Sequence, residues 1–360
     1  MAADLLDPKA VRPRTFDASK SDVLGAWLSA AIESPVRLTN VRLLGGGAVQ
    51  ENWRIEADVK GGTRAGRHSW LLRTDAAQRL AVSLDREAEY AALEAAFKAG
   101  VPVAEPILRC TDASVIGRPF FIQAFVEGQA QARHATRHPD LASFGERLAG
   151  DLGRALATIH ALTPANGTLS TLPVPMAQPA KVEVARLRAA LAAASQARPA
   201  LDYCLAWLEA NAPTTRNLTL VHGDYRTGNY MLDGTRLTAI LDWEFAHWGD
   251  PMEDIGWLCA RCWRFGNDDV THEAGGVGSR KALYDGYNAV AATKVDPTTI
   301  PYWEIMAAVK WGVIAVLQGD RFLTGGETAI ELALTGLMAP EMEFEALEGI
   351  AALEATRAGR

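Results

Sequence analysis

The sequence predicts an α+β fold with two lobes: a small N-terminal lobe with an antiparallel sheet and one main helix, and a larger, mostly helical C-terminal lobe. In the first third of the chain, apolar and polar residues alternate over short runs separated by glycine-rich turns, which is typical of half-buried strands. From residue 134 onward, apolar residues recur every three or four positions, which is typical of buried helices. A stretch rich in acids and glycines, residues 220–257, interrupts this helical half.

The composition is that of a globular protein with two cores. The chain has 360 residues, 49% of them apolar, and a formal net charge of −7, which does not favour a nucleic-acid partner because such partners select a basic face. The first residues carry acids where a signal peptide carries basic residues, and no apolar run reaches the roughly 18 to 20 residues that span a bilayer. We therefore expect a cytoplasmic protein with neither a nucleic-acid nor a membrane partner.

The N-terminal lobe begins with a helix and two strands around a glycine triplet. A helix is predicted from residue 21 to Pro35, and strands are predicted at 41–44 and 53–59. The loop between the two strands contains Gly45, Gly46 and Gly47. Because glycine has no Cβ, the backbone N–H groups of such a loop can approach phosphate closely. The triplet is therefore a candidate phosphate-binding loop, and a flexible turn is the alternative interpretation.

A third strand, a helix and two further strands complete this lobe. The third strand ends at Arg73, and an amphipathic helix follows over residues 83–97. The last strand ends at residue 126 and leads into the helical half. The lobe boundary is therefore predicted there, which divides the chain into residues 1–126 and 127–360.

Residues 220–242 carry the pattern that points most directly to a chemistry. His222-Gly-Asp224 is followed after four residues by Asn229, which is the catalytic-loop pattern of protein kinases. An Asp-Gly turn then predicts a hairpin that brings Asn229 close to Asp242. Side-chain oxygens of this pair suit a Mg²⁺ ion bound to a nucleotide, and Asp224 is free to accept the proton of an attacking hydroxyl. The stretch therefore predicts a phosphoryl-transfer site.

Two further motifs complete a family pattern. The motifs are Leu241-Asp242-Trp243-Glu244 and Gly249-Asp250-Pro251 followed by Asp254. With the catalytic-loop motif, they resemble the aminoglycoside phosphotransferase and choline kinase family, and are most similar to the subgroup linked to acyl-CoA dehydrogenases, some members of which phosphorylate hydroxyacyl-CoA. The resemblance implies a bilobal protein-kinase-like fold and an ATP- and Mg²⁺-dependent kinase that acts on a hydroxyl group of a small molecule. A kinase fold that binds nucleotide without catalysis is the alternative.

The resemblance also implies roles for residues of the catalytic loop. Asp224 would be the base, and Asn229 and Asp242 would hold the metal ion. Arg226 lies where protein kinases place a Lys against the transferred phosphate. Asp254 is expected to brace the catalytic loop rather than to touch substrate.

For the nucleotide, the resemblance implies a set of residues in the N-terminal lobe. The glycine triplet would cover the phosphates, and Arg73 stands where the wider kinase pattern has a Lys. Glu87 is the favoured carboxylate partner of this cation, and Glu89 is the competing candidate. Backbone groups of Ala124 and Val126 would meet the adenine ring.

Other motifs have a plainer interpretation. Cys259 and Cys262 have the spacing of a redox or zinc pair, but no second pair completes a metal site, which favours buried free thiols in a helix. His160 ends a predicted core helix and is interpreted as a hydrogen-bonded helix-end residue. The glycines at 61 and 66 lack the Lys-Ser/Thr of a P-loop.

The acceptor is predicted to be a neutral or anionic hydroxyl compound, with hydroxyacyl-CoA as the leading candidate because of the subgroup resemblance. An aminoglycoside is a polycation and would need an acidic cleft. The residues after the metal motif are instead rich in cations and aromatic rings, namely Arg261, Arg264, Arg280, Lys281, Trp257, Trp263, Tyr284 and Trp303. An aminoglycoside or another antibiotic is the alternative acceptor.

Overall fold

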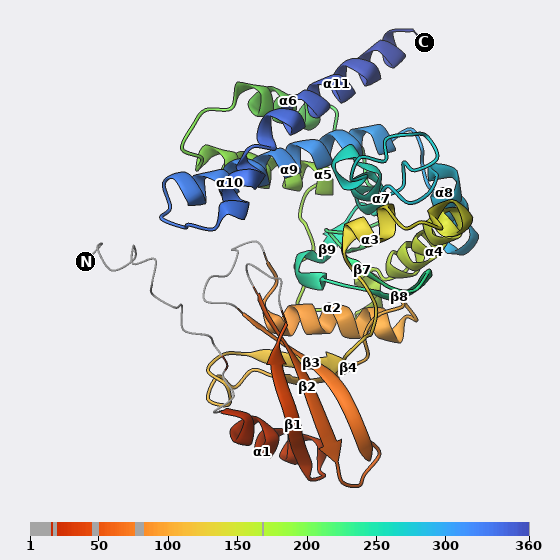
Figure 1. Cartoon of the computed structure of the whole chain (residues 1–360). Coiled ribbons are helices and arrows are strands. Elements are labelled where there is room, and N and C mark those ends of the chain that lie inside the picture. Colours follow the sequence, from red (N-terminus) through yellow and green to blue (C-terminus); the bar gives the residue numbers. More distant parts are fainter. Residues whose placement is uncertain (1–15, 17–19, 45–49, 76–82, 168, 360) are drawn as a thin grey trace.

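The computed structural model describes residues 16, 20–44, 50–75, 83–167 and 169–359 and has two lobes (Figure 1). The strands are β1 Val36–Leu43, β2 Gln50–Val59, β3 Gly66–Asp75, β4 Pro106–Cys110, β5 Phe120–Ala124, β6 Thr219–Val221, β7 Tyr230–Asp233, β8 Arg236–Ile240 and β9 His247–Gly249. The α-helices are α1 Ser21–Ile32, α2 Arg86–Lys98, α3 Ala132–Thr136, α4 Leu141–Ile159, α5 Pro179–Ala192, α6 Pro199–Ala210, α7 Pro251–Cys259, α8 Arg280–Val290, α9 Ile300–Leu323, α10 Ile330–Gly336 and α11 Ala339–Ala358. This is the α+β architecture that the sequence predicts.

The N-terminal lobe is built on a five-stranded sheet with the order β1-β2-β3-β5-β4, in which every neighbouring pair is antiparallel. Alternate side chains point to the face that α1 covers. The core on this face includes Leu24, Leu28, Trp53, Ile55, Trp70, Leu72, Phe120 and Ile122. Phe121 points to the opposite face, where its ring lies 5.8 Å from that of Tyr90 in α2. The sheet is therefore enclosed by one helix on each face.

The first strand starts earlier than the sequence predicts. β1 begins at Val36, directly after Pro35, rather than at residue 41. The pairing of β1 with β2 changes register between Leu38 and Asn40. Such an irregularity breaks the alternation of apolar and polar side chains, so it hides the first half of the strand from a prediction that relies on alternation.

Close packing of helices forms the core of the C-terminal lobe. Leu148, Leu152 and Leu156 of α4 are fully buried, as their periodicity predicts. Gly150 of α4 lies against Gly286 of α8, and a Cβ atom on Gly286 would lie 2.1 Å from the Gly150 carbonyl oxygen. A larger side chain at Gly286 would push the two helices apart.

Helix α9 is the long central helix of this lobe (Figure 1). By length and composition it could cross a membrane, since it has 24 residues and its most apolar window has a mean hydropathy of 1.4. However, 67% of that window is buried inside the structure. Its neighbours include α6, α7, α10 and α11. Packing inside the lobe therefore accounts for its apolar sequence.

The β7–β8 hairpin carries the predicted metal ligands into position. The two strands pair from Tyr230 and Ile240 to Asp233 and Arg236, with Gly234 in the turn at a φ of 59°. The Leu241 N–H donates to the Asn229 carbonyl oxygen at 2.8 Å, one step beyond the paired residues. The Asp-Gly hairpin predicted from the sequence is therefore present.

Candidate active site

Three side-chain donors hold the carboxylate of Asp224. Asn229 Nδ2 lies 2.5 Å from its Oδ2, and Trp257 Nε1 lies 2.9 Å from its Oδ1. Arg226 Nε donates to both oxygens, at 3.0 and 3.2 Å. The residue is buried, at 8% exposure. A carboxylate with this set of donors keeps one orientation, as a base that must meet one hydroxyl requires.

Asp254 braces the backbone of the catalytic loop. Its carboxylate accepts the His222 N–H at 2.7 Å and the Gly223 N–H at 3.0 Å. The ring of His160 contacts the same carboxylate at 3.2 Å and the Tyr287 hydroxyl at 2.9 Å. Burial opposes the ionised form of Asp254, but these hydrogen bonds and the nearby histidines hold its pKa below the ordinary value. His160 is therefore a hydrogen-bonded residue behind the loop.

His222 links the catalytic loop to the strand that precedes Asp242. Its Nδ1 accepts the Asp224 N–H at 3.3 Å, and its Nε2 donates to the Leu241 carbonyl at 2.9 Å. Burial lowers the pKa of this histidine, which favours the neutral ring that this pattern of bonds needs. Gly223, where protein kinases have Arg, has a φ of 80°, and a Cβ there would lie 2.3 Å from the Phe245 carbonyl oxygen. Only glycine fits this position.

Asn229 and Asp242 form a pair of oxygen donors that fits a magnesium ion. The Asn229 amide nitrogen is directed at Asp224, which leaves the amide oxygen for a metal. Asp242 has a left-handed backbone, with a φ of 67°, and its side chain is 30% exposed. Within the described part of the chain there is no group of three or more His, Cys, Asp and Glu that could hold a metal. Two protein ligands suit Mg²⁺, which completes its coordination with phosphate oxygens and water.

Arg73 connects the N-terminal sheet to the metal pair. Its guanidinium forms ion pairs with Asp242 and, through Nε at 2.8 Å, with Glu89 of α2. Burial opposes the charge of Arg73, but these carboxylates raise its pKa above the ordinary value. The structure thus places Arg73 next to Asp242, and its role toward phosphate stays a prediction.

The partner of Arg73 is Glu89, and the prediction of Glu87 is wrong. Glu89 is 2% exposed and also pairs with Arg86, whereas the Glu87 side chain is 48% exposed and lies 3.6 Å from Arg109. Residues two positions apart on a helix point in different directions, so only one of them can face the sheet. The orientation of α2 against β4 and β5 selects Glu89.

Replacement of Glu89 and of Glu87, one at a time, should show which of them forms the buried ion pair with Arg73. Glu89→Gln removes a buried carboxylate that two buried arginines share, and we expect it to lower the free energy of unfolding by about 3 kcal/mol. Arg73 keeps its ion pair with Asp242, and Arg86 keeps its ion pair with Asp75. Glu87→Gln, the matched control, removes a half-exposed charge and should change it by less than about 1 kcal/mol. Urea denaturation of both variants measures the difference, and equal losses would contradict the assignment of Glu89.

A cavity of about 330 Å³ lies between the lobes next to Arg73 and Asp242. Its further lining includes Leu44, Asn52, Leu71, Leu93, Ala104, Phe125, Met231 and Ile240. Ala124 and Val126, the predicted adenine-contacting residues, also line it. The predicted phosphate loop, Gly45 to Gly47, lies outside the described residues. The cavity has mainly apolar walls and a charged end, as a nucleotide site requires.

Arg226 lies beside the base on an aromatic platform. Its guanidinium is 4.5 Å from the centre of the Trp263 ring, and its Nη1 donates to the Thr227 carbonyl at 3.3 Å. The Trp263 ring in turn packs against Trp257 and Trp311, with centroid distances of 5.2 and 5.0 Å. The structure therefore places a cation and an apolar surface next to Asp224.

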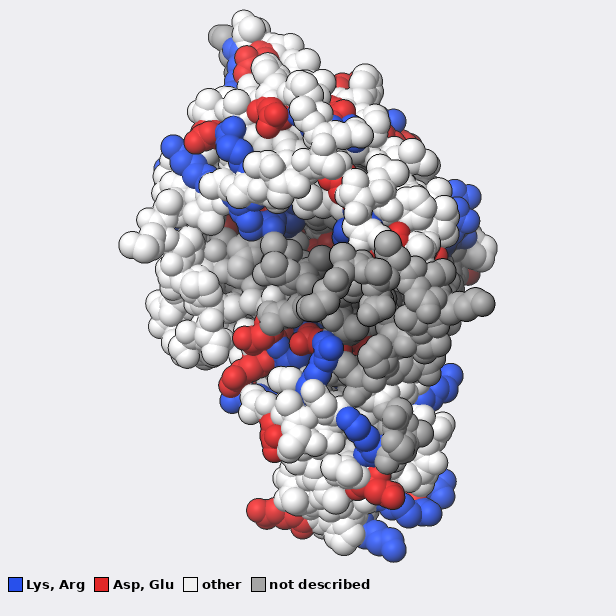
Figure 2. Space-filling view, turned by 90° about the vertical axis from the view of Figure 1, so that its left-hand side faces the viewer, with Lys and Arg blue, Asp and Glu red and all other residues white. Residues whose placement is uncertain are grey.

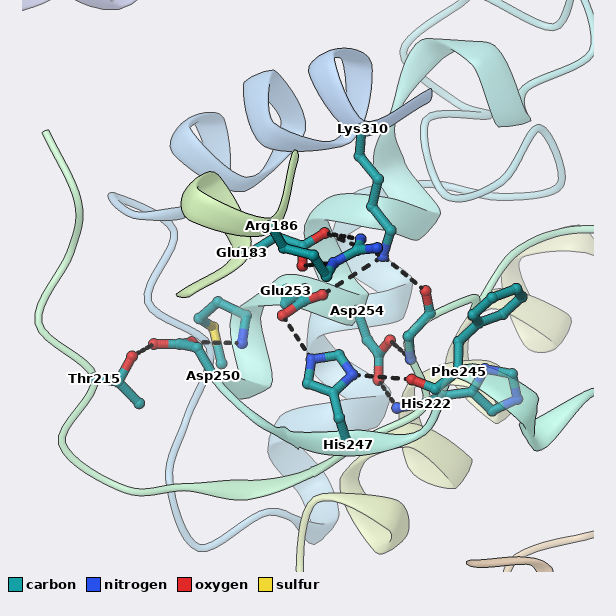
Figure 3. A network of polar contacts seen from close by, with 12 residues as sticks. Glu183, Arg186, Thr215, His222, Phe245, His247, Asp250, Glu253, Asp254 and Lys310 are labelled. Atoms are coloured by element: carbon teal, nitrogen blue, oxygen red, sulfur yellow. Dashed lines mark hydrogen bonds and ion pairs between the residues drawn. The ribbon is translucent and has the colours of Figure 1, made fainter. Parts of the chain in front are cut away.

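Sequence reasoning missed a polar network behind the catalytic loop, which Figure 3 shows. Lys310 reaches from α9 to the Gly223 carbonyl oxygen at 3.1 Å. Its ammonium lies 3.9 Å from Glu183 and 3.8 Å from Glu253. Burial lowers the pKa of His247, but its contact with Glu253 outweighs this and raises the pKa to about 9. A lone lysine in the middle of an apolar helix was the available signal.

The cations that the sequence assigns to the acceptor site are engaged elsewhere. Arg264 donates to the Cys259 carbonyl at 2.8 Å, and Arg280 pairs with Glu304 at 2.6 Å. Arg261 lies 3.6 Å from Asp268. With Glu304, these arginines line a separate cavity of about 730 Å³ between α9 and α11. Their charges are thus largely neutralised by acids that lie near them in space.

Two other expected residues also lie apart from the base. Lys281 pairs with Asp285 at 2.5 Å on the exposed side of α8. Trp303 is 1% exposed and packs against Gly256 in the core.

Cys259 and Cys262 are free thiols, and burial raises the pKa of Cys259 to about 12.

A sheet lobe over a helical lobe, a cavity between them that Asp242 lines, and a hairpin that connects Asp242 to the loop of Asp224 and Asn229 are typical of the class of protein-kinase-like phosphotransferases. The chain belongs to the phosphotransferase enzyme family (APH), whose model matches residues 40–292.

Curated relatives carry acyl-CoA dehydrogenase names. Human acyl-CoA dehydrogenase family member 11 is 28% identical over 284 residues, which cover 72% of this chain and 35% of the relative. Mouse acyl-CoA dehydrogenase family member 10 is 26% identical over 274 residues, which cover 71% of this chain and 25% of the relative. The chain thus spans about a quarter to a third of the length of these relatives. The subgroup resemblance seen in the sequence is confirmed.

Solved structures share the fold over almost the whole chain. A Ralstonia eutropha protein assigned to the aminoglycoside phosphotransferases has a TM-score of 0.73 at 22% identity and covers 93% of this chain and 98% of its own. Spectinomycin phosphotransferase in complex with ADP and spectinomycin has a TM-score of 0.57 at 13% identity, with 91% and 98% coverage. The predicted protein-kinase-like fold is therefore confirmed.

Proposed function

We propose that this protein transfers a phosphoryl group from ATP to a hydroxyl group of a small molecule, with Mg²⁺ held by Asn229 and Asp242. The observation that carries the proposal is the geometry of Asp224, a carboxylate fixed by three donors and joined directly to the metal-ligand residue Asn229. Mg²⁺, when bound, supplies positive charge to the phosphates. Nucleotide complexes of related folds, such as the ADP complex of spectinomycin phosphotransferase, support a nucleotide in the cavity.

The residues of the site divide the work of such a transfer. Asp224 would orient the acceptor hydroxyl and take its proton, and Arg226 would face the charge that develops on the transferred group. Arg73 would leave part of its contact with Asp242 to hold the nucleotide phosphates, while Glu89 keeps it in place. Positioning and charge neutralisation account for most of the catalysis in this reaction class.

We propose a neutral or anionic acceptor, with hydroxyacyl-CoA as the first candidate. Arg226 lies beside Asp224, and the apolar rings of Trp263 and Trp257 adjoin it. Figure 2 shows a group of Lys and Arg side chains on the helical lobe directly above the junction of the lobes, and Asp and Glu side chains with Lys or Arg among them directly below it. Lys and Arg side chains above the junction would suit a ligand that carries phosphates or a carboxylate. The acyl-CoA dehydrogenase names of the relatives support the same candidate.

An aminoglycoside is the second candidate, because several proteins with the same fold are named for such acceptors. At their low identity, these likenesses support the fold rather than the substrate. A non-catalytic nucleotide-binding protein is the third, and the presence of Asp224, Asn229 and Asp242 in one arrangement speaks against it.

Comparison of the two acceptors tests the proposal. We expect ADP release from ATP and Mg²⁺ with 4-hydroxyacyl-CoA, and little release with kanamycin-type aminoglycosides at equal concentration. The corresponding acyl-CoA without the hydroxyl group is the matched control, because it keeps the charge of the ligand and removes the phosphate acceptor. Turnover of the aminoglycoside alone would overturn the acceptor assignment, and nucleotide binding without ADP release for any acceptor would support the non-catalytic alternative.

A further inference from the structure

Trp257 lies directly behind the proposed base. It belongs to α7, its side chain is buried, and its indole nitrogen lies 2.9 Å from Asp224 Oδ1. We propose that Trp257 is a positioning residue, whose indole N–H sets the orientation of the Asp224 carboxylate toward the acceptor hydroxyl. The inference rests on the proposed function, because it assigns Trp257 to the base of that reaction.

The carboxylate needs a second rigid donor to keep one orientation. The terminal torsion of an aspartate side chain has a broad energy minimum, so a single contact leaves the two oxygens free to turn. Asn229 holds Oδ2 at 2.5 Å, and Trp257 holds Oδ1 at 2.9 Å. Arg226 spans both oxygens but belongs to a long side chain with 26% exposure. Trp257 is therefore the donor that fixes the second oxygen from inside the protein.

The indole ring is itself fixed relative to the catalytic loop. The Lys310 ammonium lies 4.7 Å from the centre of the Trp257 ring and donates to the Gly223 carbonyl oxygen of the same loop. The Trp263 ring also packs against the Trp257 ring, with the two centroids 5.2 Å apart. Lys310 thus holds the catalytic loop and the indole ring in one arrangement.

Trp257→Phe tests the role, because phenylalanine keeps an aromatic ring and removes the N–H. We expect kcat to fall about 10- to 100-fold, with the KM for ATP unchanged within about twofold. The split between kcat and the KM for ATP is the readout, because a general loss of packing would change both.

Trp207→Phe is the matched control. Trp207 Nε1 donates to Glu354 Oε1 at 2.9 Å, and the guanidinium of Arg357 lies 5.6 Å from its ring, so it has the same kinds of partner on α6 and α11. This variant should keep kcat within about twofold of the wild type. It loses an indole–carboxylate hydrogen bond of equal length and leaves the surroundings of Asp224 unchanged.

A measurement without turnover checks the contact itself. In ¹⁵N spectra of the indole groups, Asp224→Asn should shift the Trp257 N–H resonance and leave that of Trp207 in place. A wild-type kcat for Trp257→Phe, or a Trp257 indole resonance that does not shift in Asp224→Asn, would overturn the inference. ADP release by the wild type would still support the proposed kinase activity in that case. Absence of ADP release by the wild type with every acceptor would overturn both.

Discussion

The Asp224→Asn variant should bind MgATP with close to wild-type affinity and lose about 10²- to 10⁴-fold of its turnover, the usual worth of a positioned general base. The expected split follows from the site, because Asp224 is hydrogen-bonded to Asn229, Arg226 and Trp257, whereas the proposed nucleotide cavity is lined by Arg73 and Asp242. Asparagine keeps the shape of the side chain and removes its capacity to take a proton.

ADP release with the best acceptor measures the turnover, and calorimetric titration with MgATP measures the affinity. Asp233→Asn is the matched control, since Asp233 is an exposed residue of the same hairpin that pairs with Arg236 at 3.0 Å. It should leave both quantities unchanged. Wild-type turnover by Asp224→Asn with a confirmed substrate would refute the assignment of the base.

Asp242→Ala should weaken Mg²⁺-dependent nucleotide binding more than Asn229→Ala does. A carboxylate offers a full charge to the metal, and an amide oxygen offers only a dipole. Loss of a residue that merely supports a metal ligand typically costs about 10- to 100-fold in affinity, so loss of Asp242 should cost at least about 100-fold. The alanine also frees Arg73, which keeps its ion pair with Glu89.

Titration of ATP into both variants, with and without Mg²⁺, separates the metal from the rest of the site. We expect the Mg²⁺-dependent part of the affinity to disappear in Asp242→Ala and to persist, reduced, in Asn229→Ala. Equal losses in the two variants would contradict the ranking. A metal-independent affinity that also collapses in Asp242→Ala would mean that Arg73 no longer holds its position.

Residues that are close in the sequence were predictable as a site. His222, Asp224 and Asn229 lie on one loop, and a two-strand hairpin connects that loop to Asp242. Local rules of turn chemistry and strand pairing are enough to bring such residues together. The helical core was predictable for a similar reason, since the period of apolar residues in α4 directly selects its buried face.

The identity of the Arg73 partner was not predictable in this way. Both Glu87 and Glu89 lie in the first turn of an amphipathic helix, and each would suit a cation by charge alone. Which of them faces the sheet depends on the rotation of α2 about its axis, which packing against β4 and β5 decides. A sequence pattern limits this rotation only to a broad face, and two adjacent candidates can both satisfy it.

The sequence by itself determined the α+β class, the family, and the hairpin that connects the loop of Asp224 and Asn229 to Asp242. Tertiary structure alone decided that Lys310 meets Gly223 and Trp257, and that Arg264 and Arg280 turn to Glu304 instead of the base. The physical reason is distance along the chain. Contacts between helices depend on how whole side-chain surfaces interdigitate, and that fit is a property of the packed core rather than of any single motif.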